Sequence, residues 1–199
     1  MVEVNCRGLA CPSPVINTKK ALDKVESGTV TTIVDNVISR DNVVMFAKNL
    51  GYSVAVEQQG TEYHLTITKG ETDQPASSVS PVMPPTEQNK QVYFISSDGM
   101  GRGSDELGII LMRSFIFTLT EVKPTPAALI FVNAGVKLTT DESTVLEHLH
   151  ALQNSGTVII SCGTCLDYFG LKDKLVVGRI SNMYDIVEYL SGAGKLITI

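Results

Sequence analysis

The first 70 residues alternate between short β-branched runs and segments whose apolar residues recur at helical spacing. This pattern predicts strands over residues 2–5, 29–35, 52–58 and 61–68, and helices over residues 12–25 and 39–50. The order is βαβαββ. It predicts a small two-layer sandwich, in which the helices lie on one face of a four-stranded sheet.

From residue 91 onward, strands and helices alternate more regularly. The expected strands are residues 91–96, 127–133, 157–161, 175–178 and 195–199, and the expected helices are 104–120, 141–154, 165–169 and 182–190. This rhythm predicts an α/β fold with a mostly parallel sheet and helices on both faces. In such sheets, ligands and reactive groups lie beyond the carboxyl ends of the strands.

The segment between these two patterns is rich in proline, serine, threonine and glutamine, and half of the eight prolines lie between Pro75 and Pro85. This composition favours a partly extended linker over residues 71–90. The sequence therefore predicts two domains, residues 1–70 and residues 91–199.

The predicted helix over residues 108–119 is apolar nearly all round, interrupted by Arg113 and Ser114. One face must cover the sheet, and the other needs a second partner. Burial inside a larger domain is the alternative, but a domain of about 110 residues offers little to bury both sides. We therefore expect a homo-oligomer that forms through the C-terminal domain.

The chain has 199 residues and a net charge of −5, from 16 basic and 21 acidic side chains. An acidic total gives no general attraction to nucleic acids or anionic membranes. The longest apolar run, residues 127–132, is far shorter than a membrane span of roughly 20 residues. The N-terminus lacks a basic region followed by an apolar one, so we expect no secretory signal and a cytoplasmic location.

The four cysteines form two close pairs that lie far apart in the sequence. In a reducing cytoplasm, such cysteines are more often reactive or metal-binding than structural disulfides. A single C-x-x-C is weak evidence for zinc, and the nearby His148 and His150 fall within a predicted helix. We therefore expect neither a metal nor a cofactor. The cysteines are Cys6, Cys11, Cys162 and Cys165.

Cys11 directly precedes the first predicted helix, and Pro12 suits the first helical position. Cys11 is then expected at the N-cap, where it faces the positive end of the helix dipole. Together with a positive charge from Arg7, this environment favours the thiolate. Pro14 stiffens the first turn, and Gly8 lets the preceding loop bend back. The alternative is that Cys11 is only a small apolar cap residue.

Residues 7–14, Arg-Gly-Leu-Ala-Cys-Pro-Ser-Pro, resemble the Arg-Gly-Leu-x-Cys-Pro-x-Pro motif of the TusA (SirA-like) sulfur-carrier family. The resemblance implies that Cys11 carries sulfur as a persulfide and hands it to another thiol. Asn5 stands where the family often has Asp. Cys6 could resolve a persulfide or disulfide on Cys11 or merely fill space, and we favour the second interpretation. The motif positions that support Cys11 are Arg7, Gly8, Leu9, Pro12 and Pro14.

Cys162 and Cys165 form a C-x-x-C at the end of a predicted parallel strand and the start of a short helix. This arrangement acidifies one thiol and supplies a resolving partner. A redox pair, half of a zinc site and two buried cysteines all remain open. We favour Cys162, the first of the pair, as the attacking thiol.

A glycine-rich loop over residues 97–103 links the first strand of the second domain to the apolar helix. Gly99, Gly101 and Gly103 permit close backbone approach at a helix N-terminus, where an anionic substrate could bind. The loop matches neither the dinucleotide fingerprint nor the P-loop, and a simple tight turn is equally compatible with it.

The second domain resembles the DsrE-like sulfur-relay fold, and the whole chain resembles the YedF proteins, which are sulfurtransferase-like and associated with selenium metabolism. Residues 100–103, 106–108, 111–112 and 161–165 carry the wider resemblance. It implies a relay from a cysteine desulfurase-like donor to Cys11, then to Cys162 or Cys165, and on to a downstream thiol. The alternatives are a redox-sensing or metal-binding regulatory module without turnover and, less favoured, a general disulfide oxidoreductase.

Overall fold

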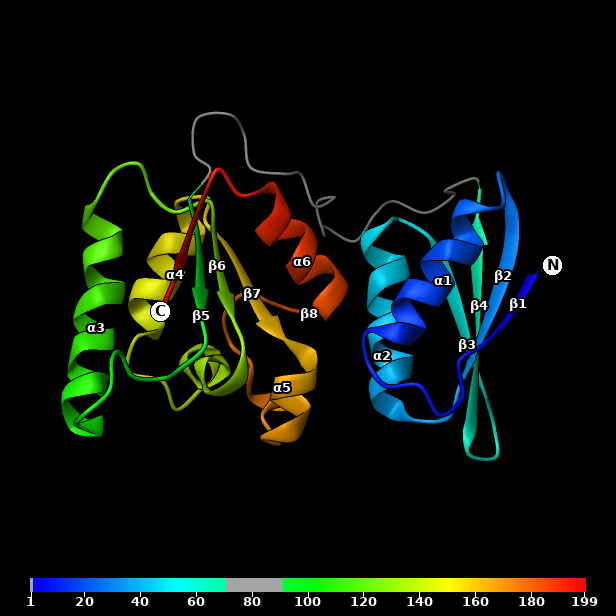
Figure 1. Cartoon of the computed structure of the whole chain (residues 1–199), viewed down its shortest axis with the longest axis horizontal. Helices are drawn as coiled ribbons and strands as arrows, with labels where there is room; N and C mark the ends of the chain where they lie inside the picture. The colour runs from blue at the N-terminus through cyan, green and yellow to red at the C-terminus, as the bar shows by residue number, and fades with distance from the viewer. Residues whose placement is uncertain (1, 71–90) are drawn as a thin grey trace. The chain divides into compact units, whose positions relative to one another are not determined.

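A computed structural model describes residues 2–70 and 91–199, which form two compact units with separate sheets (Figure 1). The linker predicted over residues 71–90 lies outside the described residues.

The N-terminal unit has the predicted βαβαββ order, with both helices on one face of a four-stranded sheet (Figure 1). The strands lie in the order β1-β2-β4-β3, in which β1 runs parallel to β2 and the other pairs are antiparallel. The elements are β1 (Val2–Asn5), α1 (Ser13–Asp23), β2 (Gly28–Val34), α2 (Val37–Asn49), β3 (Ser53–Gln59) and β4 (Glu62–Lys69).

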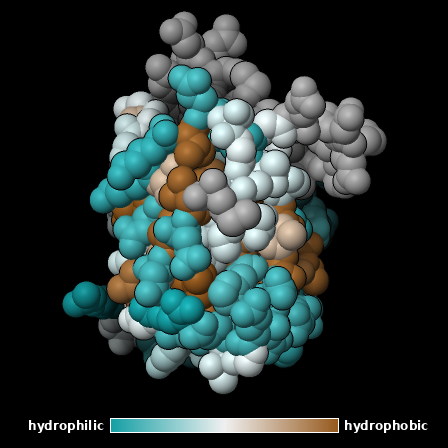
Figure 2. Space-filling model, turned by 90° about the vertical axis from the view of Figure 1, so that its right-hand side faces the viewer, coloured by the Kyte–Doolittle hydropathy of each residue, from teal (hydrophilic) through white to brown (hydrophobic). Residues whose placement is uncertain are grey.

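The core of this unit lies between the sheet and its two helices. Val30 of β2 and Ile67 of β4 lie opposite each other and pack in one cluster with Val15 and Leu22 of α1 and Phe46 of α2. Burial of each such side chain contributes about 1.5–3 kcal/mol. The opposite face of the sheet carries polar side chains with apolar ones between them (Figure 2).

The C-terminal unit is a five-stranded, fully parallel sheet in the order β8-β7-β6-β5-β9. Helices α3 and α4 lie on one face and α6 on the other, which confirms the predicted fold class (Figure 1). The elements are β5 (Gln91–Ile95), α3 (Asp105–Glu121), β6 (Ala128–Phe131), α4 (Leu146–Asn154), β7 (Val158–Cys162), α5 (Gly163–Tyr168), β8 (Arg179–Ser181), α6 (Met183–Gly192) and β9 (Lys195–Thr198), with 3₁₀ helices η1 (Asn133–Thr139) and η2 (Lys172–Lys174).

Two sequence predictions in this unit are wrong. The strand expected over residues 175–178 is absent; Leu175 makes only an isolated bridge to Thr140, and β8 begins at Arg179. Gly178, at φ +77, lies so close to Ile159 that a β-carbon would collide with it, and the chain turns there into β8. The helix expected from residue 141 begins at Leu146, since the preceding residues form η1 and turns.

Helix α3 is two-sided. Gly108, Met112, Ile116 and Leu119 are buried. The opposite side exposes the outer stripe, which comprises Leu107, Ile110, Leu111 and Phe117. In the part of the chain that the structure describes, no helix combines the length and apolar character needed to cross a membrane.

Candidate functional site

The loop from Cys6 to Cys11, here called the carrier loop, connects the end of β1 to the start of α1. The Cys6 amide donates to the Ile33 carbonyl at 2.8 Å, which extends the pairing of β1 with β2 by one residue. The chain then reverses at Gly8, whose φ of +69 favours glycine. The Leu9 amide donates to the Cys6 carbonyl at 3.3 Å, so the loop closes on itself.

Side chains from three other segments hold the carrier loop. The Gly8 amide donates to Asp35 Oδ2 at 2.7 Å, and this hydrogen bond is the main reason why the pKa of Asp35 lies below its usual value. Ser39 Oγ donates to the Leu9 carbonyl at 3.2 Å. Asn5 Oδ1 accepts a hydrogen bond from the Arg7 amide at 3.2 Å. The conformation of the loop is therefore specified from outside it as well as from within.

The guanidinium of Arg7 binds Glu62 in a two-pronged pair, with Nε and Nη2 both 2.7 Å from the carboxylate oxygens. The Glu62 carboxylate raises the pKa of Arg7, and in return Arg7 lowers the pKa of Glu62. The sequence suggested that the positive charge of Arg7 supports a thiolate at Cys11. In the structure, this charge is paired with Glu62 of β4. Arg7 connects the loop to the sheet, and this role could not be read from the motif.

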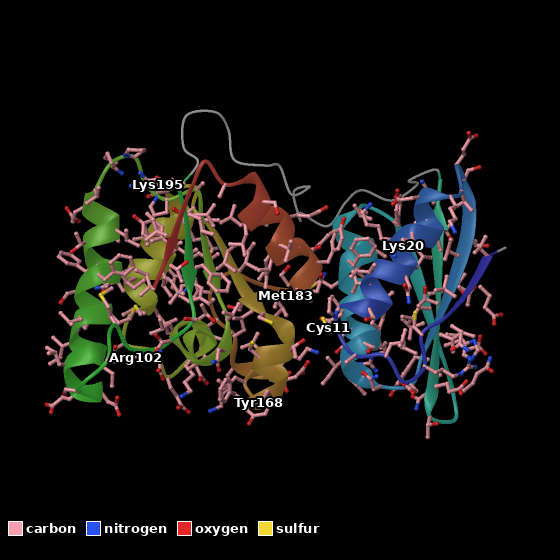
Figure 3. The ribbon with its side chains drawn as sticks, in the orientation of Figure 1. Cys11, Lys20, Arg102, Tyr168, Met183 and Lys195 are labelled. Atoms are coloured by element: carbon pink, nitrogen blue, oxygen red, sulfur yellow. The ribbon has the colours of Figure 1, made fainter. Side chains whose placement is uncertain are left out.

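Cys11 lies in a turn before α1, partly exposed (Figure 3). The expectation that it is the N-cap is wrong, because Pro12 occupies that position and α1 begins at Ser13. The Ser13 amide donates to the Ala10 carbonyl at 3.0 Å, and Pro12 and Pro14 have no amide hydrogen to offer. Cys11 nevertheless lies only two residues before the start of α1.

Cys6 is fully buried in the core of the N-terminal unit, beside Val15 and Val34. Burial raises the pKa of its thiol, and the Asn17 amide, 3.9 Å from Sγ, offsets this only in part. These features favour the space-filling interpretation of Cys6. A buried, protonated thiol is a poor nucleophile.

The hydrogen bond from the Gly8 amide to Asp35 should stabilise the conformation of the carrier loop. Asp35→Ala leaves the Gly8 amide without its partner, so we expect this amide to exchange with deuterium severalfold faster. Asp35→Asn keeps an acceptor oxygen and is the matched control, with near-normal exchange. Hydrogen exchange resolved by NMR measures the rate at the Gly8 amide. A wild-type rate in Asp35→Ala would show that Asp35 does not hold the loop.

In the C-terminal unit, β7 ends at Cys162 and α5 starts at the next residue, which places the C-x-x-C at the carboxyl edge of the sheet. Cys162 is only 2% exposed, whereas Cys165 is partly exposed. The Asn133 amide, at the start of η1 beyond β6, donates to Cys165 Sγ at 3.1 Å. The two thiols also share a hydrogen bond.

The two thiols of this pair have opposite electrostatic character. The hydrogen bond from Cys162 and, more weakly, the Asn133 amide lower the pKa of Cys165 to about 6, although burial opposes them. The hydrogen bond to Cys165 and burial raise the pKa of Cys162. Near neutral pH, the arrangement is therefore a Cys165 thiolate that accepts a hydrogen bond from a Cys162 thiol. These electrostatics favour Cys165 as the attacking thiol, whereas the order of the pair suggested Cys162.

Two family models divide the chain between them. The sulfurtransferase TusA model matches residues 2–69, and the DsrE/DsrF-like model matches residues 92–199. A relative from Methanocaldococcus jannaschii, whose name describes it as a candidate sulfur carrier protein, is 34% identical over 71 residues, which are 35% of this chain and 95% of the relative. The chain belongs to the TusA and DsrE/DsrF-like families.

Two solved structures are similar to parts of this chain. A SirA-like protein from Desulfitobacterium hafniense is 39% identical to this chain and matches 36% of it and 100% of its own length, with a TM-score of 0.34. The ychN protein from E. coli is 17% identical and matches 56% of this chain and 99% of its own, with a TM-score of 0.45. We refer below to the TusA unit and the DsrE-like unit.

The glycine-rich loop of the DsrE-like unit packs on its own helix. The Met100 amide donates to the Gly108 carbonyl at 2.9 Å, and Gly99 lies against the Gly108 backbone, where a β-carbon would be tight. Ser104 caps α3, its Oγ accepting a hydrogen bond from the Leu107 amide at 3.3 Å. Close packing therefore accounts for Gly99, and an anion site formed with Gly101 and Gly103 stays a prediction.

Sequence reasoning missed Asn133 and Lys137, both on η1. Lys137 Nζ lies 3.1 Å from Asp98 of the glycine-rich loop and 5.3 Å from the ring centroid of Phe169, beside α5. This lysine thus links the loops that follow β5, β6 and β7. The only signal was the position of Asn133 directly after a buried strand, where a polar residue that tolerates a turn is common.

Among the residues that the structure describes, no group of three or more histidine, cysteine, aspartate or glutamate side chains is placed to hold a metal ion. What the two sites share is a partly exposed cysteine near the start of a helix, Cys11 before α1 and Cys165 in the first turn of α5. That arrangement suits thiol exchange.

Proposed function

We propose that the protein is a sulfur or selenium relay in which Cys11 accepts a persulfide-type cargo and passes it to Cys165. The observation that supports this most directly is the partly exposed Cys11 within a TusA-family match, on a loop held in one conformation. A TusA unit and a DsrE-like unit joined in one chain supply a carrier and a second thiol site. The donor is a cysteine desulfurase-like enzyme, and the final acceptor is a thiol.

In the first step, the Cys11 thiolate attacks the outer sulfur of the donor's persulfide. A new sulfur–sulfur bond forms on Cys11, and the donor cysteine leaves as a thiolate. In the second step, the Cys165 thiolate attacks the outer sulfur of the Cys11 persulfide, and Cys11 leaves as a thiolate. Each step exchanges one sulfur–sulfur bond for another, so it needs no oxidant. Transfer within one chain and between two chains are both compatible with it.

The cargo can leave Cys165 in two ways. An acceptor thiolate can attack the outer sulfur directly. Alternatively, Cys162 loses its proton and attacks Cys165 Sγ, which forms the Cys162–Cys165 disulfide and releases hydrosulfide or hydroselenide. A dithiol reductant must then supply two electrons to restore the pair. The hydrogen bond between the two sulfurs places Cys162 within reach of this attack.

The test is incubation of the full chain with a cysteine desulfurase and free cysteine, followed by intact mass measurement. We expect a gain of one sulfur atom that a reducing agent removes. A redox-sensing or metal-binding module would gain no sulfur under these conditions; it would instead show a disulfide after mild oxidation, or bound zinc after purification. The absence of a sulfur adduct would contradict the relay.

The outer stripe of α3 fits a second copy of this chain. Its side chains recur at three- and four-residue spacing, and Leu107, Ile110 and Phe117 are about half exposed, which is costly for a monomer in water. A helix pairing with itself about a two-fold axis would cover the same residues on both copies. We therefore infer that the DsrE-like unit forms homo-oligomers through α3.

This interface predicts that Ile110→Glu dissociates the oligomer to monomers, because two glutamates would be buried against each other. Val187→Glu is the matched control, since Val187 is an equally exposed valine on α6 and lies on the other face of the sheet. Light scattering coupled to size-exclusion chromatography measures the mass. A wild-type protein that is monomeric, or an Ile110→Glu protein that is not, would contradict the interface.

A further inference from the structure

Asn133 occupies a backbone conformation that its neighbours do not share. Among the non-glycine residues that the structure describes, it is the only one with a positive φ, +48. In that left-handed region the β-carbon crowds the following carbonyl, and Asn is one of the few residues that tolerate it. The Asn133 side chain is exposed, so its packing does not explain the residue.

The left-handed turn directs the Asn133 amide toward α5. Asn133 begins η1, separated from the end of β6 by Val132, and its N–H reaches Cys165 Sγ at 3.1 Å. The rest of η1 is fixed to the sheet: the Val132 amide donates to the Ile95 carbonyl at 3.0 Å, and Gly135 lies so close to that carbonyl that a β-carbon would collide with it. The amide therefore approaches the sulfur from a rigid support.

We propose that Asn133 is a positioning residue whose left-handed backbone holds an N–H on the Cys165 sulfur and keeps this cysteine as a thiolate. The inference rests on the proposed function in one respect, namely that Cys165 is the attacking thiol. The hydrogen bond favours the charged form of the sulfur, because an N–H donor stabilises an anion more than a neutral thiol. It also fixes where the sulfur lies when it attacks.

Other charged groups near α5 are already paired. Lys137 lies 3.1 Å from Asp98, Lys172 lies 3.5 Å from Asp167, and Lys174 lies 2.6 Å from Glu142. The remaining titratable groups on α5 and on the elements packed against it are Cys162, Tyr168 and Asp173. Of all these groups, only Cys162 contributes to the shift in the pKa of Cys165, alongside burial and the Asn133 amide.

The test measures the pH dependence of alkylation at Cys165 in the full chain, with iodoacetamide and peptide mass spectrometry. No sulfur donor is present. Asn133→Gly keeps both the N–H and the left-handed conformation, so we expect a half-maximal rate near the wild-type pH. Asn133→Val disfavours that conformation because valine is β-branched. We expect its midpoint to rise by about one pH unit, which lowers the alkylation rate at pH 6 about fivefold and leaves it unchanged at high pH.

A merely structural role would change the rate at every pH or leave the midpoint in place. Asn133→Ala, which places a smaller strain on the turn, keeps the test decisive if Asn133→Val does not fold; we expect an intermediate midpoint. Unchanged midpoints in all variants, or an equal shift in Asn133→Gly, would overturn the inference. Because alkylation needs no persulfide, these outcomes are independent of the sulfur-loading test: failed loading would refute the relay and leave the role of Asn133 intact.

Discussion

Cys11→Ser is expected to abolish sulfur loading when the protein is incubated with a cysteine desulfurase and cysteine. The hydroxyl cannot form a persulfide, and of the two cysteines in the TusA unit only Cys11 is accessible. Intact mass before and after reduction measures the adduct. The loss should be complete in the TusA unit, because its other thiol, Cys6, is buried.

Cys6→Ala is the control for this result, since it removes a cysteine from the same segment. We expect normal loading and a loss of about 1 kcal/mol in unfolding free energy from the small cavity left in the core. Chemical denaturation measures the second quantity. Loading that survives Cys11→Ser but not Cys6→Ala would reverse the roles of the two cysteines and refute the proposed carrier site.

The second large effect is expected at the C-x-x-C, where substitution of each cysteine should block a different step. Cys165→Ser should leave Cys11 loaded and reduce transfer to the DsrE-like unit to background, because the attacking thiolate is gone. Cys162→Ser should still accept sulfur on Cys165 but block release as hydrosulfide. Mass measurement of the Cys11 and Cys162–Cys165 peptides distinguishes the two outcomes.

The same pair predicts the pH dependence of transfer. Cys165 has a pKa of about 6, so the thiolate is the minor form below that pH and the major form above it. Transfer should therefore increase as pH rises through about 6 and level off near neutrality. Cys162→Ala removes the largest cause of the lowered pKa and should move the midpoint upward, whereas Cys162→Ser keeps a hydroxyl donor and should move it less. The same midpoint in Cys162→Ala and in the wild-type protein would contradict the shared hydrogen bond.

Much of the fold followed from the pattern of apolar residues. Strands β2 and β4 were expected from the β-branched run at residues 29–35 and the alternation at residues 61–68. Strand-forming side chains and turn glycines act locally, so such segments can be found in the sequence. The C-x-x-C lies at the predicted edge of the parallel sheet for the same reason. The family resemblance at residues 7–14 points to Cys11 as the carrier cysteine, and the structure places this residue, partly exposed, in the loop before α1.

The parts that could not be predicted depend on contacts between distant segments. Arg7 pairs with Glu62, and Gly8 bonds Asp35; neither partner has a signal within the motif. The 3₁₀ helix η1 lacks helical periodicity and exists because its glycine fits closely against β5. The order of the C-x-x-C pointed to Cys162, but burial and the donor on Asn133 favour Cys165.

The burial of Cys6 has a consequence for how long the cargo survives. With its only companion thiol protonated and inside the core, the TusA unit has no internal group that can discharge a persulfide on Cys11. Leakage as free sulfide should therefore be slow in this unit, and the lifetime of the loaded form should be set by encounters with an outside thiol. The DsrE-like unit differs, because the Cys162 and Cys165 side chains are in contact. A persulfide on Cys165 could therefore be discharged within that unit.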